Sequence, residues 1–318
     1  MNFVLTVIGL GLLVGAGDAL VRGAVALSLR LGVPVLIISL TVVAFGTSAP
    51  ELVVGVEAAL ADADGIAFGN VVGSNIANIL LVLGLPALIA VIRTELCDSR
   101  RSWIGMVAAS LLFIVLCHFG PLVWWHGLVL LAGLVWMLAD AWAETRKAQA
   151  EGADAAALAE IEDVDPHMAP WKVAGLLLAG IVGLPIGAHL LIDGARGVAL
   201  AFGLSEAAIG LTLVAVGTSL PELMTSVMAA LRKQAEVAIG NVVGSNLFNL
   251  LGIMGVVSFF GPLDVPPEFL RLDLWVMLGC SLLLIPAVFP RWPIGWAMGA
   301  GFVALYVVYG VVVLGPRV

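Results

Sequence analysis

The chain contains a long internal repeat, and this repeat limits the folds that it can adopt. Residues 32–84 align without a gap on residues 203–255 at a constant offset of 171 residues, and 27 of the 53 aligned positions are identical. The most similar stretches are "AFGTSAPEL" at 44–52 with "AVGTSLPEL" at 215–223, and "GNVVGSNIANIL" at 69–80 with "GNVVGSNLFNLL" at 240–251. Identity at one fixed offset indicates a duplicated structural unit.

The composition indicates a chain that lies within a lipid bilayer. Hydrophobic residues make up 62% of the 318 residues and charged residues only 11%, and the mean hydropathy is +1.14. Such a chain cannot bury its apolar surface in one soluble core. Apolar segments of about 20 residues, the length that spans about 30 Å of hydrocarbon, lie at 2–29, 33–60, 66–92, 102–119, 122–143, 171–200, 205–231, 237–260, 270–289 and 293–315.

The repeat and the segment count together predict an inverted architecture. The offset carries the chain through five segments, an odd number, so the two copies enter the membrane in opposite directions. We therefore expect an all-α membrane protein with ten transmembrane helices in two inverted five-helix repeats. The predicted divisions are a first repeat at 1–143 with its motif at 41–84, an acidic cytoplasmic linker at 144–170, and a second repeat at 171–318 with its motif at 212–255.

The distribution of lysine and arginine predicts the orientation. If the N-terminus lies outside, eleven of the fourteen basic residues fall at the inner ends of the segments. The positive-inside rule favours this arrangement over its inverse. Both termini are therefore expected outside.

The first motif concentrates oxygen donors inside an apolar segment. On a helix, Thr47, Ser48 and Glu51 share one face, and Ala44 lies one turn earlier on that face. Pro50 lacks an amide hydrogen, so it should kink the helix and release carbonyl groups near Ala44 to Gly46. Carboxylate, hydroxyl and carbonyl oxygens are ligands of hard cations such as calcium and sodium, whereas zinc and copper prefer histidine and cysteine.

The second motif adds further oxygen donors, and the repeat duplicates the whole set. Ser74 and Asn78 are i, i+4 neighbours in "GNVVGSNIAN" and supply a hydroxyl and an amide oxygen. The counterparts in the second copy are Ala215, Thr218, Ser219, Glu222, Ser245 and Asn249. Folding about a pseudo-two-fold axis would bring Glu51 and Glu222 face to face, and one calcium ion or two sodium ions would balance their charge.

These motifs resemble the alpha repeats of the calcium/cation antiporter superfamily, in its sodium/calcium exchanger branch. The resemblance rests on "GTSAPE", "GTSLPE" and two copies of "GNVVGSN". It implies exchange of calcium for sodium by alternating access, and it implies ligand roles for Ala44, Thr47, Ser48, Glu51, Ser74 and Asn78 and for their six counterparts. The cation/proton exchangers of the superfamily typically carry Glu-His where this chain has Gly-Ser, which favours the sodium branch. Many sodium/calcium exchangers carry Asp at one member of the pair Asn78 and Asn249, whereas this chain has Asn at both.

We therefore predict a secondary antiporter in the plasma (inner) membrane of a prokaryote, with calcium and sodium as transported ions and no cofactor. The linker at 144–170 is too short for the calcium-sensing domains of eukaryotic exchangers. The expected partners are these ions, possible coupling protons and the lipid bilayer, with no nucleic acid.

Coupling to protons or potassium, or transport of another cation such as magnesium, is the alternative. An intramembrane hydrolase is disfavoured because the chain has no HExxH and no Gly-x-Ser-x-Gly motif; a passive channel is the third hypothesis.

Two further pairs of polar residues lie in the first and sixth segments. Asp18 and Arg22 are spaced i, i+4, and the offset of 171 maps them onto His189 and Asp193. We interpret them as ion pairs near helix ends or as guides for sliding of these two helices. Glu57 lies six residues beyond Glu51, where it could attract cations to an outer mouth or face the lipid headgroups.

Overall fold

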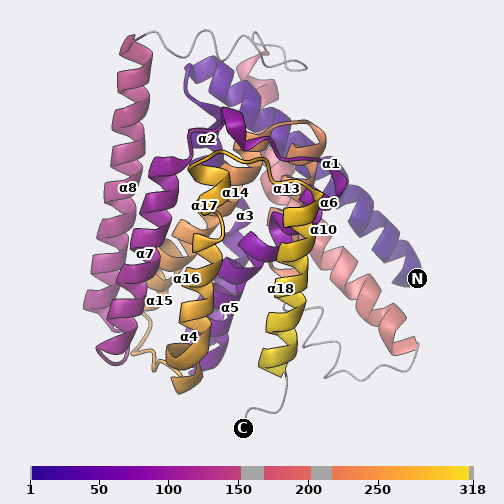
Figure 1. The fold of residues 1–318 in the computed structure, drawn as a ribbon. Coiled ribbons are helices and arrows are strands. Elements are labelled where there is room, and N and C mark those ends of the chain that lie inside the picture. Colours follow the sequence, from indigo (N-terminus) through magenta and orange to yellow (C-terminus); the bar gives the residue numbers. More distant parts are fainter. Residues whose placement is uncertain (1, 152–167, 202–216, 315–318) are drawn as a thin grey trace.

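The computed structural model describes residues 2–151, 168–201 and 217–314, and these residues are almost entirely helical (Figure 1). Within these ranges, eight helices are long and apolar enough to cross a membrane, and a bent helix pair forms a ninth candidate span. Of the segment predicted at 205–231, the structure describes only the part from residue 217 onward. The predicted all-α membrane fold is confirmed.

The described helices follow the predicted segments closely. The unbroken long helices are α1 (Asn2–Leu31), α7 (Arg100–His118), α8 (Trp124–Glu151), α10 (Pro170–Ala201) and α18 (Trp296–Leu314). The bent or interrupted spans contain α2 (Val35–Ile38), α3 (Ala44–Thr47) and α4 (Ala49–Leu60); α5 (Asp64–Ala77) and α6 (Gly84–Ile89); α13 (Leu220–Leu231); α14 (Ala235–Leu247) and α15 (Met254–Val257); and α16 (Leu274–Leu282) and α17 (Ile285–Val288). Wider π-helical turns occupy Ser39–Val43, Asn78–Val82, Phe248–Ile253 and Phe269–Asp273.

The end of the first predicted repeat differs from the helix that the structure shows. Helix α8 continues to Glu151, eight residues beyond the predicted boundary at 143 and into the sequence assigned to the linker. The helix after the linker, α10, begins at Pro170, one residue before the predicted second repeat, and proline fits the first turn of a helix. Residues 152–167 of the predicted linker lie outside the described residues.

The turn after the first motif is repeated in its backbone conformation, although its sequence is not repeated. Helices α4 and α13 each have 12 residues, and each is followed by a non-glycine residue with positive φ. These residues are Asp62, with φ of 51°, and Lys233, with φ of 57°, and they stand 171 positions apart. Because non-glycine residues seldom adopt this conformation, its occurrence at equivalent positions shows that the two copies fold alike.

Two short antiparallel bridges join the halves of the chain at equivalent places. Ile92 and Ile294 exchange two backbone hydrogen bonds of 3.0 Å, and Leu122 and Leu263 exchange two of 2.9 Å. Adding 171 to 92 gives 263, and adding it to 122 gives 293, one residue from Ile294. Each bridge therefore joins a loop of one half to a loop of the other, in an arrangement related by the pseudo-two-fold axis.

Helices α1 and α10 form a long pair beside the remaining helices (Figure 1). Glycine makes their close packing possible, because a Cβ atom on Gly9 would lie 2.5 Å from the backbone nitrogen of Leu191 and one on Gly180 would lie 2.5 Å from the Leu20 Cβ. The centre of the protein is formed by other spans: 94% of the apolar window in 235–257 is buried and 72% of that in 64–89. The "GNVVGSN" segments thus occupy the most buried part of the described structure.

Candidate cation site

Both motif helices are broken at the serine of the motif. Ser48 has φ of −85° and ψ of 7°, and Ser219 has φ of −84° and ψ of 3°, outside helical geometry. The two parts of the first span, Val35–Thr47 and Ala49–Leu60, are bent by 46° at this break. Proline in the first turn of each following helix explains the break, since proline cannot continue the preceding hydrogen-bond pattern. The predicted kink is present, as a complete break.

The break places each motif glutamate at the start of a helix. Glu51 lies in the first turn of α4, and Glu222 lies in the first turn of α13. The amide groups and the dipole of a helix N-terminus stabilise negative charge nearby. Since both side chains are only 1% exposed, this placement offsets part of the cost of burying two carboxylates in an apolar environment.

The two copies of the motif meet at these glutamates. The Ser48 hydroxyl donates a hydrogen bond to Oε1 of Glu222 over 3.1 Å, although the residues are 174 positions apart. Since Ser48 lies three positions before Glu51, this bond brings the first turns of α4 and α13 together.

Many of the predicted ligand atoms are buried without a hydrogen-bond partner. Among the described residues these atoms are Glu51 Oε2, Asn78 Oδ1, Ser219 Oγ, Glu222 Oε2, Ser245 Oγ and Asn249 Oδ1. Buried polar groups are nearly always paired, so a set of unpaired oxygens requires an explanation. Carboxylate, amide and hydroxyl oxygens together form the donor set of a hard cation.

The remaining predicted ligands have different surroundings. The Ala44 carbonyl is not released by Pro50, because it accepts hydrogen bonds from the Ser48 amide at 3.0 Å and the Thr47 hydroxyl at 3.3 Å. The Gly46 carbonyl, at the other end of the predicted range, does lose its usual donor, since that donor would be the residue four positions later, Pro50. The hydroxyl oxygen of Thr47 also lies 3.2 Å from Oδ1 of Asn241, which is a second possible acceptor for its single hydrogen.

The last three predicted ligands are Ser74, Thr218 and Ala215. Ser74 is buried with 5% exposure, and Thr218 is half-buried. Ala215 lies outside the residues that the structure describes. The structure thus joins the two copies through the contacts of Ser48 with Glu222 and of Asn78 with Asn246, and the Ala44 carbonyl keeps its hydrogen bond with the Ser48 amide.

Sequence reasoning missed a pair of asparagines that support the glutamates. Asn70 donates from Nδ2 to the backbone carbonyl of Glu51 over 3.0 Å, and Asn241 donates in the same way to the carbonyl of Glu222 over 3.2 Å. Each bond ties the helix that follows a motif turn to the helix that carries the glutamate. The sequence signal was the identity of both asparagines in the two "GNVVGSN" segments.

Comparison with known proteins agrees with this arrangement. The family described as sodium/calcium exchanger protein matches residues 1–139 and 172–315. The chain belongs to this family. It is therefore a cation exchanger of the sodium/calcium exchanger family and not an enzyme, and the recognition of the family from the motifs is confirmed.

Two relatives of this exchanger match it over nearly its whole length. The inner membrane protein YrbG of Escherichia coli is 33% identical, with 94% of each chain covered, and the sodium/calcium exchanger MaX1 of Methanosarcina acetivorans is 32% identical, with 98% of each covered. The solved structure of the sodium-calcium exchanger NCX_Mj, with sodium and strontium, has a TM-score of 0.82 at 33% identity over 98% of both chains. Ten helices in inverted repeats form that structure, and the same fold is thereby confirmed here.

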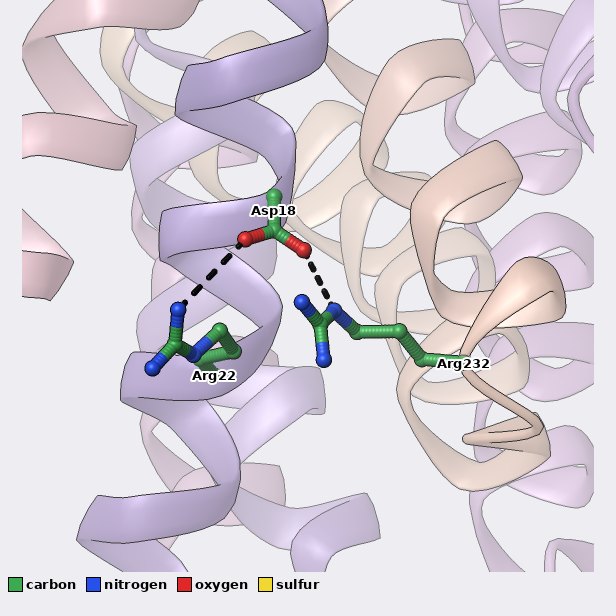
Figure 2. Close-up of polar contacts among 3 residues, drawn as sticks. All are labelled: Asp18, Arg22 and Arg232. Carbon is green, nitrogen blue, oxygen red and sulfur yellow. Dashed lines mark hydrogen bonds and ion pairs between the residues drawn. The ribbon is translucent and has the colours of Figure 1, made fainter. Parts of the chain in front are cut away.

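In this exchanger, Asp18 of α1 pairs with two arginines (Figure 2). Its carboxylate forms an ion pair with Arg22 at 3.8 Å and a closer one with Arg232, which follows α13. On α10, His189 and Asp193 lie 3.3 Å apart. Both pairs expected within a helix are thus present, and the contact with Arg232 is an addition that sequence spacing could not reveal. Glu57 is exposed.

Proposed function

We propose that this protein is a secondary active antiporter that exchanges calcium for sodium by alternating access. The observation that supports this proposal is the pair of buried carboxylates, Glu51 and Glu222, each with an oxygen that has no hydrogen-bond partner. The proposed ligand set comprises Glu51, Glu222, Thr47, Ser48, Thr218, Ser219, Ala44, Ala215, Ser74, Asn78, Ser245 and Asn249. Of these, the carboxylates supply the charge and the neutral oxygens complete the coordination.

Competition for one site would couple the two ion flows without ATP. Two carboxylates carry a charge of −2, which one calcium ion or two sodium ions neutralise. An empty, doubly charged site is costly to move through an apolar interior, so the protein changes its access readily only when it is loaded. The α1–α10 pair packs beside the core that holds the carboxylates, and its movement over that core is the proposed switch of access.

The proposed setting is the plasma (inner) membrane of a prokaryote, with both termini outside and calcium moved outward. The clustering of lysine and arginine at one set of helix ends supports this orientation. The proposed repeats are 1–143 and 171–318, joined by a cytoplasmic acidic linker at 144–170.

The test is calcium-45 uptake by purified protein in liposomes. We expect uptake driven by an outward sodium gradient and little uptake with equal sodium on both sides or with potassium replacing sodium. Uptake that is equal with and without a sodium gradient would refute sodium coupling. Calcium flux with no counter-ion at all would instead identify a passive channel.

A proton- or potassium-coupled exchanger is the second candidate. The observation that favours it is the asparagine at both 78 and 249, because the site then has two carboxylates and no third. A smaller negative charge changes how many sodium ions can balance one calcium ion. Liposomes with a pH gradient or a potassium gradient, each at constant sodium, separate these two forms of coupling from the first proposal.

A further inference from the structure

Two asparagines at equivalent positions of the repeat make different contacts. Asn75 and Asn246 stand 171 positions apart, and both are 1% exposed. The Asn75 side chain donates from Nδ2 to the Val71 carbonyl of its own helix over 2.7 Å. The Asn246 side chain instead reaches the other repeat, where its Nδ2 lies 3.3 Å from the backbone carbonyl oxygen of Asn75. This difference breaks the symmetry of the site.

The contacts of Asn246 fix the orientation of its amide group. The groups near its Nδ2 are the Asn75 carbonyl oxygen and, at 3.6 Å, the sulfur of Met106, and neither can donate a hydrogen bond. The NH₂ of Asn246 must therefore point toward them, because a flipped amide would place two acceptors together. As a result, Oδ1 of Asn246 points toward Asn78.

The orientation of Asn78 follows from that of Asn246. Its Nδ2 donates to Oδ1 of Asn246 over 3.0 Å, across 168 positions of sequence. The other atom of the same amide, Oδ1 of Asn78, is buried and has no hydrogen-bond partner. A chain of donors and acceptors thus begins at a fixed backbone carbonyl and ends at one unpaired oxygen.

We infer that Asn246 is a positioning residue that keeps the Asn78 oxygen available to the transported cation. The inference rests on the proposed function, since it assigns Asn78 to the cation site. Orientation is critical for asparagine because its amide has one end that binds a cation and one end that repels it, whereas both oxygens of an aspartate bind. The hydrogen bond from Asn78 to Asn246 lets a neutral side chain serve reliably as a ligand.

A double-mutant cycle tests this inference in reconstituted liposomes. Asn246→Ala removes the acceptor that orients Asn78, and we expect the KM for the transported cation to rise about five- to tenfold with little change in the maximal rate. Asn78→Ala should raise the KM at least as much. In the Asn78→Ala background, Asn246→Ala should add no further effect, because its action passes through Asn78.

Ser258→Ala is the matched control, since Ser258 is also 1% exposed and its hydroxyl bonds to the Met254 carbonyl four residues earlier. It should leave the KM within about twofold of the wild type, as expected for a change outside the site. Equal increases in KM for Ser258→Ala and Asn246→Ala, or additive effects of Asn78→Ala and Asn246→Ala, would overturn the inference. If Asn246→Ala fails to fold, Asn246→Leu preserves the side-chain size, removes the polar contacts with Asn75, Met106 and Asn78, and has the same expected outcome.

The design separates the two proposals. Wild-type exchange tests the proposed function, and the cycle is measured with the cation that the wild type carries. If the wild type shows sodium-driven calcium exchange but the effects of Asn78→Ala and Asn246→Ala on the KM are additive, the proposed function stands and the role of Asn246 is rejected. A wild type that couples to a different ion, combined with a non-additive cycle, would reject sodium coupling and retain the role of Asn246.

Discussion

The hydroxyl of Ser48 donates a hydrogen bond to the carboxylate of Glu222 over 3.1 Å, and this contact joins the two copies of the duplicated motif. Ser48 is the residue at which the first motif helix breaks, and Glu222 lies in the first turn after the equivalent break. Neither repeat alone therefore contains this contact. The duplication supplies two similar motifs, and the fold places them against each other.

Removal of either buried carboxylate should abolish exchange. Glu51→Gln and Glu222→Gln preserve shape but halve the negative charge, so we expect calcium affinity to fall by about a hundredfold or more. Liposome uptake of calcium-45 measures the loss, and size-exclusion chromatography checks folding. Glu57→Gln, on the same helix but exposed, is the control and should retain exchange. Retained transport in both buried variants would refute the assignment of the site.

Ser48→Ala should weaken cation binding without abolishing it. A hydrogen bond to a buried carboxylate contributes about 1.5–3 kcal/mol, so the KM for calcium should rise about ten- to a hundredfold. Ser39→Ala is the comparison, because Ser39 is equally buried and its hydroxyl bonds to the Val35 carbonyl of its own helix. Similar kinetics for these two variants would mean that the contact with Glu222 does not contribute to binding.

Gly244→Ala should destabilise the protein. A Cβ atom at this position of α14 would lie 2.5 Å from the Leu40 carbonyl oxygen and 2.6 Å from the Ala44 Cβ, and the backbone atom cannot move aside cheaply. Overpacking of this kind costs about 1–3 kcal/mol. Thermal unfolding in detergent should show a lower melting temperature. At Gly279 a Cβ atom would meet no atom within 4 Å, and Gly279→Ala should unfold at or above the wild-type temperature.

Arg232→Gln should affect the rate of exchange more than stability. The ion pair with Asp18 is about one quarter exposed on both sides, and such pairs contribute at most about 1 kcal/mol. If α1 moves over the core as proposed, this contact must break, so its loss should speed exchange by up to about fivefold. Initial rates in liposomes give the comparison, with Lys233→Gln as a neighbouring charge control. A slower Arg232→Gln, or an equal acceleration in Lys233→Gln, would argue against a contact that restrains α1.

The break at Ser48 shows how far the sequence predicted the site. Pro50 predicted a kink and the exposure of carbonyl groups, and the break is present at the serine. Of the carbonyl groups predicted to be released, that of Gly46 loses its usual donor, because that donor would be Pro50, whereas that of Ala44 remains bonded to the Ser48 amide. The pattern of the sequence located the interruption, but the hydrogen bonds around it depend on the exact point where each helix stops.

The asparagines show what sequence reasoning could not reach. Asn75 and Asn246 occupy the same position in identical "GNVVGSN" segments, yet one bonds within its helix and the other reaches across to the opposite repeat. Identical local sequence cannot distinguish them, because the difference lies in what each side chain faces.

The sequence by itself determined the membrane class, the inverted duplication and the presence of carboxylates in both copies, because hydropathy, repeat offset and residue type are properties of the chain read in order. The tertiary structure alone decided that Ser48 meets Glu222 and that Asn246 meets Asn78. These partners are 174 and 168 positions apart, so their contacts depend on how two duplicated halves pack. Packing, and not composition, gives two similar motifs different contacts and joins them to each other.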